Sequence, residues 1–267
     1  MLNKLEKITS TVNKPFGTIL FLHSFMGKFQ LRETMRNYYK EYNFYGINLP
    51  GHGESPITKT SDISIENFIN LLKEFVESNN LEDIVLVSHS LGSGLAAILN
   101  TIFPNRIKLN VFEAPACGVM QRNYDVIEKL IPSSIDDTKF ILEKMYFDLS
   151  KTFGSTLNKV VKSSYEMSSK TFGEYKKIFT RQKVEEMGEL FDNAYKQITA
   201  PSLVIMGQSD GILPTGLLSD HFKSMNNSKI SQEIIPRSSH VVYFEQQKKF
   251  LVAMDRFLFE NGLQTTK

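Results

Sequence analysis

The sequence of 267 residues contains one cysteine, no tryptophan and no long hydrophobic segment. The single Cys117 excludes an intramolecular disulfide and agrees with a reducing compartment. No apolar run approaches the ~18 residues that a membrane-spanning helix needs, and the first residues lack the apolar core of a signal peptide. We therefore expect a cytoplasmic protein without an integral membrane segment.

The sequence also lacks a strong excess of charge of either sign. Its 31 Lys and Arg residues nearly balance 29 Asp and Glu residues, for a net charge of +2, which gives no indication of nucleic-acid binding. No group of His, Cys or acidic residues has the spacing of metal ligands, and no glycine-rich phosphate loop occurs. We expect neither a metal site nor a cofactor.

Apolar runs alternate with helical patterns along most of the chain. Buried strands are predicted at residues 18–23, 44–49, 84–88, 109–112, 203–206 and 230–235. Helical periodicity is present between them, for example at 64–76, 91–103 and 245–261. This alternation predicts an α/β fold, with a mostly parallel central sheet and helices on both faces.

One segment interrupts the alternation. Residues 116–197 contain no good strand and four helical patterns, at 124–131, 137–149, 168–179 and 183–198. The segment is too long for a loop, so we interpret it as a helical cap or lid over the carboxyl edge of the sheet. Residues 1–115 and 198–267 then form the core domain. The alternative is an insertion that packs on the core without a function.

The most informative motif is Ser88-His89-Ser90-Leu91-Gly92, which follows a buried apolar strand and begins a helix. This is the spacing of a nucleophile elbow, in which a serine lies on a strained turn with its hydroxyl exposed. Gly92 meets the need for a small residue two positions later, and Ser88 meets it approximately two positions earlier. The alternative is an ordinary serine at a helix N-terminus.

Four further segments lie at predicted strand ends. Residues 23–27 read His-Ser-Phe-Met-Gly, residues 49–55 Leu-Pro-Gly-His-Gly-Glu-Ser, residues 206–214 Met-Gly-Gln-Ser-Asp-Gly-Ile-Leu-Pro, and residues 238–245 Ser-Ser-His-Val-Val-Tyr-Phe-Glu. Together with the elbow they resemble the α/β-hydrolase superfamily, in its cap-bearing esterase and lipase branch, over nearly the whole chain. The chain departs from the family pattern at Ser24, where glycine is usual, and at Asn48, close to the usual place of an acid.

The resemblance implies a catalytic triad of Ser90, Asp210 and His240, in the family's chain order. A serine hydroxyl needs an imidazole to remove its proton, and the imidazole needs a carboxylate to hold its tautomer. Asp210 precedes a glycine and could instead be a turn residue. Glu113, at the end of another strand, is a rival for the acid, because some relatives place the carboxylate there.

The resemblance also implies an oxyanion hole formed by the backbone N–H groups of Phe25 and Leu91. Candidate substrate-binding residues are His23, Ser24, His89, Met145 and Val241. His23 is also a candidate for a structural role in its loop, and His89 for simple packing.

We therefore predict a serine hydrolase that cleaves carboxylic esters through an acyl-enzyme on Ser90. The expected partner is a small-molecule ester with an apolar acyl group, and the expected state is a monomer or homodimer. The same residues could serve an amide, thioester or carbon–carbon hydrolase, including an aminopeptidase-like enzyme. They could also belong to a non-catalytic small-molecule receptor.

Overall fold

The computed structural model describes residues 1–265, which form one seven-stranded sheet. The strands are β1 (Lys7–Ser10), β2 (Thr18–Leu22), β3 (Asn43–Ile47), β4 (Ile84–His89), β5 (Ile107–Glu113), β6 (Ser202–Gly207) and β7 (Ile230–Ile235). Their order across the sheet is β1-β3-β2-β4-β5-β6-β7. Only β1 is antiparallel to its neighbour. The predicted mostly parallel sheet is confirmed.

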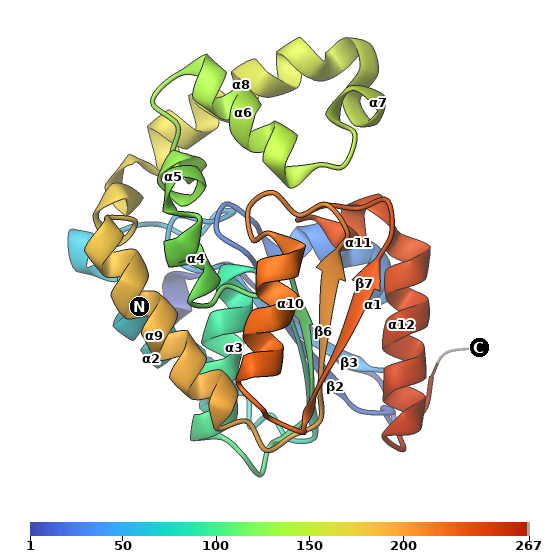
Figure 1. Cartoon of the computed structure of the whole chain (residues 1–267). Coiled ribbons are helices and arrows are strands. Elements are labelled where there is room, and N and C mark those ends of the chain that lie inside the picture. Colours follow the sequence, from blue (N-terminus) through green and yellow to red (C-terminus); the bar gives the residue numbers. More distant parts are fainter. Residues whose placement is uncertain (266–267) are drawn as a thin grey trace.

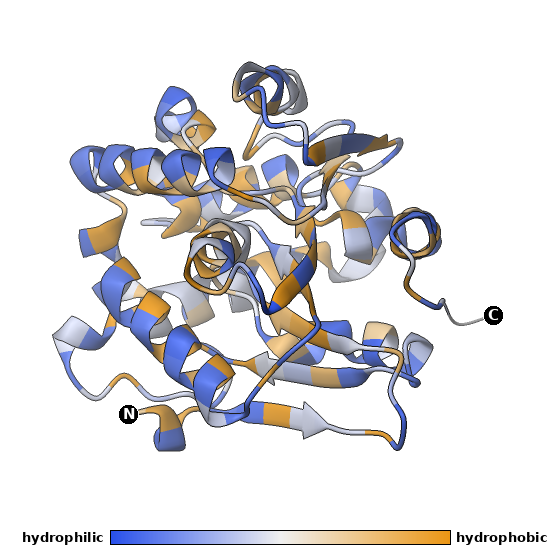
Figure 2. Cartoon of the chain, turned by 90° about the horizontal axis from the view of Figure 1, so that it is seen from below, coloured by the Kyte–Doolittle hydropathy of each residue, from blue (hydrophilic) through white to orange (hydrophobic). Residues whose placement is uncertain are grey.

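Helices cover both faces of this sheet (Figure 1). One face carries α1 (Glu33–Tyr38), α11 (Val242–Glu245) and α12 (Gln247–Glu260), and the other carries α2 (Ile65–Ser78), α3 (Leu91–Ile102), α9 (Arg181–Lys196) and α10 (Thr215–Ser224). In Figure 2, hydrophobic residues gather on the central elements, while peripheral helices carry long hydrophilic stretches. This is the three-layer arrangement that the alternating pattern predicts.

Strand β4 begins with four consecutive apolar residues, and its surroundings explain why. Ile84 and Leu86 pack in the hydrophobic cluster under α2 and α3, whereas Val85 and Val87 pack in the cluster under α1 and α12. Successive side chains of a strand point to opposite faces, and both faces are covered here. Every residue of β4 is buried as a result.

The segment between β5 and β6 contains α4 (Val119–Arg122), α5 (Tyr124–Ile127), α6 (Ile135–Met145), α7 (Leu149–Phe153) and α8 (Leu157–Thr171), followed by α9. Figure 1 shows α6, α7 and α8 beyond the carboxyl ends of the strands. We name residues 116–197 the capping segment after this position. The predicted helix at 168–179 is wrong, because α8 ends at Thr171 and Gly173–Ile178 forms a 3₁₀ helix.

The last helix of that segment, α9, packs directly on the core helix α3. A Cβ atom at Gly94 would lie 2.3 Å from the ring of Phe191, so only glycine allows this approach. Phe191 is itself completely buried. The middle of the segment and its last helix therefore have different surroundings: α6 to α8 extend over the sheet edge, and α9 belongs to a layer of the core.

Candidate active site

Ser90 lies at the junction of β4 and α3, and its backbone has φ 52° and ψ −116°, a conformation that residues other than glycine rarely adopt. Such strain persists only where the surrounding structure imposes it, and it is concentrated at functional sites. Gly92 accounts for the fit of the turn, since a Cβ atom there would lie 2.5 Å from the carbonyl oxygens of Leu22 and His23. Ser88 is accommodated because its hydroxyl donates to Ser93 Oγ at 3.1 Å.

Asp210 and His240 meet at the carboxyl edge of the sheet. His240 Nδ1 lies 2.9 Å from Asp210 Oδ2, and both side chains are buried. The other carboxylate oxygen, Oδ1, accepts hydrogen bonds from the backbone N–H groups of Ile212 and Leu213, at 2.8 and 2.9 Å. The turn after β6 thus holds the carboxylate in one orientation, and the carboxylate orients the imidazole.

The rival acid Glu113 has different partners. Its carboxylate forms a buried ion pair with Arg32 and accepts a hydrogen bond from the backbone N–H of Tyr243 at 2.7 Å. The Arg32 guanidinium lies between two rings, 4.9 Å from the centre of Phe21 and 4.4 Å from that of Tyr243. The structure therefore brings Asp210, and not Glu113, to the imidazole of His240.

Ser90 and His240 line the same cavity, which has a volume of about 500 Å³. Its wall also includes Glu113 and four of the predicted substrate-binding residues, Ser24, His89, Met145 and Val241. Part of its apolar lining comes from the capping segment, with Leu130, Ile141 and Leu142 beside Met145. The cavity therefore joins the predicted nucleophile and base to a hydrophobic wall.

The two predicted oxyanion donors have different positions relative to this cavity. Phe25 contributes to the lining. The centre of its ring lies 4.7 Å from that of Phe179 and 5.1 Å from those of Phe172 and Tyr175. Leu91 is buried and is the first residue of α3, where an N–H group has no partner within the helix. Its amide is thus available at the helix start beside Ser90.

His23 is not among the residues that line this cavity, so its contact with substrate stays a prediction. Its Nε2 accepts a hydrogen bond from the N–H of Leu49 at 3.0 Å, and its Nδ1 donates to the carbonyl of Ser24 at 2.7 Å. Burial lowers the pKa of His23 to about 4, so the ring is neutral. Both ring nitrogens are used to join two loops, which is the structural role considered from the sequence.

His52 and His89 are also buried neutral rings, because burial holds the pKa of each well below its ordinary value. His52 Nε2 accepts from the N–H of Met26 at 3.1 Å. His89 Nε2 donates to the carbonyl oxygen of His240 at 3.0 Å. His52 therefore supports the loop after β2, and His89 supports the loop that carries the predicted base.

The capping segment also holds the loops of the predicted triad. The carbonyl of Met145 accepts a hydrogen bond from the N–H of His240 at 3.1 Å, and the carbonyl of Lys144 accepts from the N–H of Gly211 at 3.1 Å. Lys144 further accepts from the hydroxyl of Ser239 at 2.8 Å. The end of α6 is therefore hydrogen-bonded to the loops of both Asp210 and His240.

Sequence reasoning missed three residues that shape this region. Arg32 and Tyr243 enclose Glu113, and Glu6 accepts a hydrogen bond from Asn48 Nδ2 at 2.6 Å. Asn48 stands near the usual place of a family acid, and the carboxylate of Glu6 lies beside it. The only sequence signal for these pairings was the unusual Asn48, since each partner is distant in the chain.

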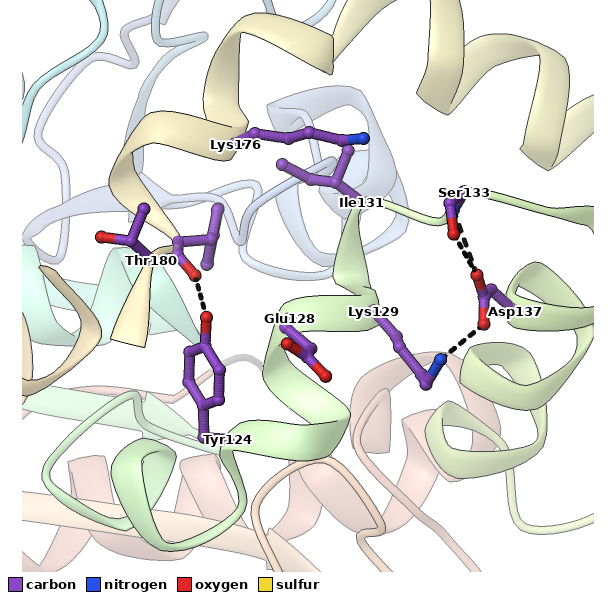
Figure 3. A pocket seen from close by; sticks show the side chains of 9 residues that line it. Tyr124, Glu128, Lys129, Ile131, Ser133, Asp137, Lys176 and Thr180 are labelled. Atoms are coloured by element: carbon purple, nitrogen blue, oxygen red, sulfur yellow. Dashed lines mark hydrogen bonds and ion pairs between the residues drawn. The ribbon is translucent and has the colours of Figure 1, made fainter. Parts of the chain in front are cut away.

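A second hollow, of about 330 Å³, lies within the capping segment and is shown in Figure 3. Two of its charged groups pair with each other, since Lys129 Nζ lies 2.6 Å from Asp137 Oδ1, and the hydroxyl of Ser133 donates to the same carboxylate. The hollow does not include Ser90, Asp210 or His240. It is therefore separate from the candidate active site.

A family model described as "alpha/beta hydrolase fold" matches residues 17–247, so this chain belongs to the α/β hydrolase fold family. The protein named "Putative esterase/lipase 1" of Mycoplasma pneumoniae is 29% identical over 258 residues, covering 96% of each chain. Its namesake in Mycoplasma genitalium is 28% identical over 257 residues, again covering 96% of each. The family match and these relatives support a hydrolase.

Solved structures share the fold. A meta-cleavage product hydrolase from Pseudomonas fluorescens IP01 superposes with a TM-score of 0.79 at 16% identity, covering 96% of this chain and 94% of the other. A protein titled "putative lipase" from Acinetobacter baumannii AYE superposes with a TM-score of 0.75 at 19% identity, covering 97% and 93%. No helix within residues 1–265 has the length and apolar character to cross a membrane.

Proposed function

We propose that this protein is a serine hydrolase of carboxylic esters. Ser90 is the nucleophile, His240 the general base and Asp210 the carboxylate that orients His240. The observation that carries the proposal is the 2.9 Å contact between Asp210 Oδ2 and His240 Nδ1, beside a cavity that both His240 and a strained Ser90 line. A nucleophile, a base and a carboxylate from three separate strand ends are the groups that nucleophilic catalysis by serine requires.

In the proposed reaction, Ser90 Oγ attacks the ester carbonyl while His240 Nε2 removes the hydroxyl proton. The N–H groups of Phe25 and Leu91 stabilise the oxyanion of the tetrahedral intermediate. His240 then gives the proton to the departing alcohol, which leaves an acyl group on Ser90. Water activated by His240 hydrolyses this acyl-enzyme and restores the serine.

The cavity wall supports an apolar acyl group as the main recognition element. Leu130, Ile141, Leu142 and Met145 supply a hydrophobic surface from the capping segment. Burying such a group contributes about 25 cal/mol per Å² of apolar surface, so longer acyl chains gain binding energy until the cavity is full. We propose that residues 116–197 act as a cap that selects the acyl chain.

A substrate panel tests the reaction class. Folded protein is assayed with p-nitrophenyl esters of increasing acyl length, aminoacyl amides, acyl-CoA thioesters and a substrate cleaved at a carbon–carbon bond. We expect turnover of esters above the others, together with fluorophosphonate labelling that Ser90→Ala abolishes. Preference for another substrate class would keep the triad and reject the ester assignment. A folded protein without label at Ser90 would favour the receptor alternative.

A further inference from the structure

Three side chains with metal-binding atoms converge outside the catalytic cavity. Cys117 lies in the loop after β5, Asp192 on α9 and His221 on α10, and their ligand atoms all lie within 4.8 Å of one another. None of them lines the cavity of Ser90. The expectation that no metal-ligand cluster exists was based on sequence spacing, and these residues are too far apart in the chain for spacing to reveal them.

The contacts in this cluster orient its donor atoms. Asp192 Oδ1 accepts hydrogen bonds from the backbone N–H of Gly118 at 3.0 Å and from His221 Nε2 at 2.9 Å. A Cβ atom at position 118 would lie 2.4 Å from Asp192 Oδ2 and 3.3 Å from His221 Cε1. Glycine at this position therefore keeps a side chain out of the space beside the carboxylate and the imidazole.

The donor set has the composition of a zinc site. One thiolate, one imidazole and one carboxylate, completed by water, match the three protein ligands and one open position of many Zn²⁺ sites. Tetrahedral coordination at the usual bond lengths separates ligand atoms by roughly 3.3 to 3.6 Å. Separations of no more than 4.8 Å can reach that range through side-chain adjustments of about an ångström.

The surroundings shield the sulfur and leave access for an ion. Burial raises the pKa of the Cys117 thiol well above its ordinary value, and the hydrogen bond from the backbone N–H of Val119 offsets only part of this rise, so a bound ion has to displace the thiol proton. Cys117 is buried, whereas the side chains of His221 and Asp192 are 13% and 16% exposed to solvent. The cluster thus has a protected sulfur on one side and a path from solvent on the other.

We propose that Cys117, Asp192 and His221 bind one Zn²⁺ ion. The thiol proton is released to solvent, and the thiolate and carboxylate then balance the two charges of the ion. The proton that His221 Nε2 donates to Asp192 moves to Nδ1, and the freed Nε2 lone pair turns from Asp192 to the metal. The N–H of Gly118 holds the carboxylate as an outer hydrogen-bond partner, a common arrangement around metal ligands.

An ion at this position joins three segments near the active site. Helix α9 ends the capping segment, and α10 follows the turn that carries Asp210. The loop of Cys117 is connected to the nucleophile, because the N–H of Ala116 donates to the carbonyl of Ser90 at 3.1 Å. Bound zinc therefore stabilises the junction between the capping segment and the core.

The test uses the full chain, freed of metal with a chelator and dialysed. Zn²⁺ is titrated in competition with a chromophoric chelator, and Co²⁺ is added separately as a spectroscopic probe of thiolate coordination. We compare wild type with Cys117→Ser, Asp192→Asn and His221→Gln. Asp220→Asn is the control, because Asp220 is an exposed carboxylate on the same helix, paired with Lys223.

We expect one Zn²⁺ per chain, a sulfur-to-cobalt charge-transfer band, and a melting temperature that rises with Zn²⁺. Each ligand variant should weaken zinc binding by at least the 10- to 100-fold that loss of an outer partner costs, and Asp220→Asn should not. Cys117→Ser should also lose the band. No stoichiometric zinc binding in wild type, or equal binding in a folded His221→Gln variant, would overturn the proposal.

Discussion

Replacing Asp210 with asparagine exchanges one carboxylate oxygen for an amide nitrogen with almost no change in shape. The structure determines which atom takes which place. Two backbone N–H groups, from Ile212 and Leu213, donate to the Oδ1 side, so the amide oxygen of the variant must occupy that side. The amide NH₂ then faces His240 Nδ1, where the native Oδ2 accepts.

This orientation reverses the tautomer of the imidazole. Nδ1 of His240 becomes the acceptor, and its proton moves to Nε2, which can no longer take the proton of Ser90. Triads with this substitution lose about 10⁴-fold in kcat. That loss corresponds to about 5.5 kcal/mol in activation free energy, at 1.36 kcal/mol per tenfold. The folded state loses little, because every hydrogen bond in this turn still has a donor and an acceptor.

Glu113→Gln is the matched control, since it makes the same chemical change at the rival acid. It leaves the buried guanidinium of Arg32 without its counter-charge. Removing one partner of a buried ion pair costs about 3–5 kcal/mol of stability. At roughly 2–4 °C per kcal/mol, the melting temperature falls by about 10 °C. Turnover per folded molecule should fall by less than about tenfold, an activation cost below 1.4 kcal/mol.

The assay measures kcat on a short p-nitrophenyl ester and, in parallel, thermal unfolding of each variant. Asp210→Asn should lose turnover with a nearly unchanged melting temperature, and Glu113→Gln should show the reverse. If Glu113→Gln abolished turnover in folded protein while Asp210→Asn kept a tenth of it, the triad acid would follow β5 and our assignment would fail.

Three other predictions follow from the structure. Ser90→Gly and Ser90→Ala should both abolish ester hydrolysis. The free energy of unfolding, measured by denaturant titration, should be about 1–2 kcal/mol higher for the glycine variant, because glycine relieves the backbone strain at φ 52°. Equal stabilities of the two variants would contradict that strain. Ile141 lines the cavity, so Ile141→Trp should occupy part of its volume and shift the ester preference to shorter acyl chains. Ile135→Trp, on the exposed side of α6, should leave the preference unchanged. An unchanged preference in Ile141→Trp would show that α6 does not take part in substrate selection. The pKa of His23 is about 4 in the folded protein and 6.5 when unfolded, so the unfolded state binds more protons between these pH values, and the free energy of unfolding should fall by about 3 kcal/mol as the pH drops from 6.5 to 4. Denaturant titrations at several pH values should show a weaker dependence of the unfolding free energy on pH in His23→Asn than in wild type. An identical dependence would refute this origin.

Much of the fold follows from local signals in the sequence. The predicted positions of β2 to β7 agree with the structure, and β2, β4 and β6 are short runs that are buried because both faces of the sheet are covered there. Strand β7 was expected to be buried as well, but it lies at the sheet edge and only Ile235 is buried. The elbow at Ser90 was recognisable because the turn requires a small residue at Gly92. Strand β1 was missed, since it lies at the sheet edge with half of its residues exposed and no apolar run to mark it.

Only the tertiary structure shows which side chains from distant parts of the chain contact one another. It brings Asp210 to His240 and gives Glu113 to Arg32, a choice that two strand-end acids left open in the sequence. It uses both nitrogens of His23 within the loops, and it gathers Cys117 with Asp192 and His221. Periodicity and turn residues report the local backbone, whereas these pairings arise only when the sheet order places separate strand ends side by side.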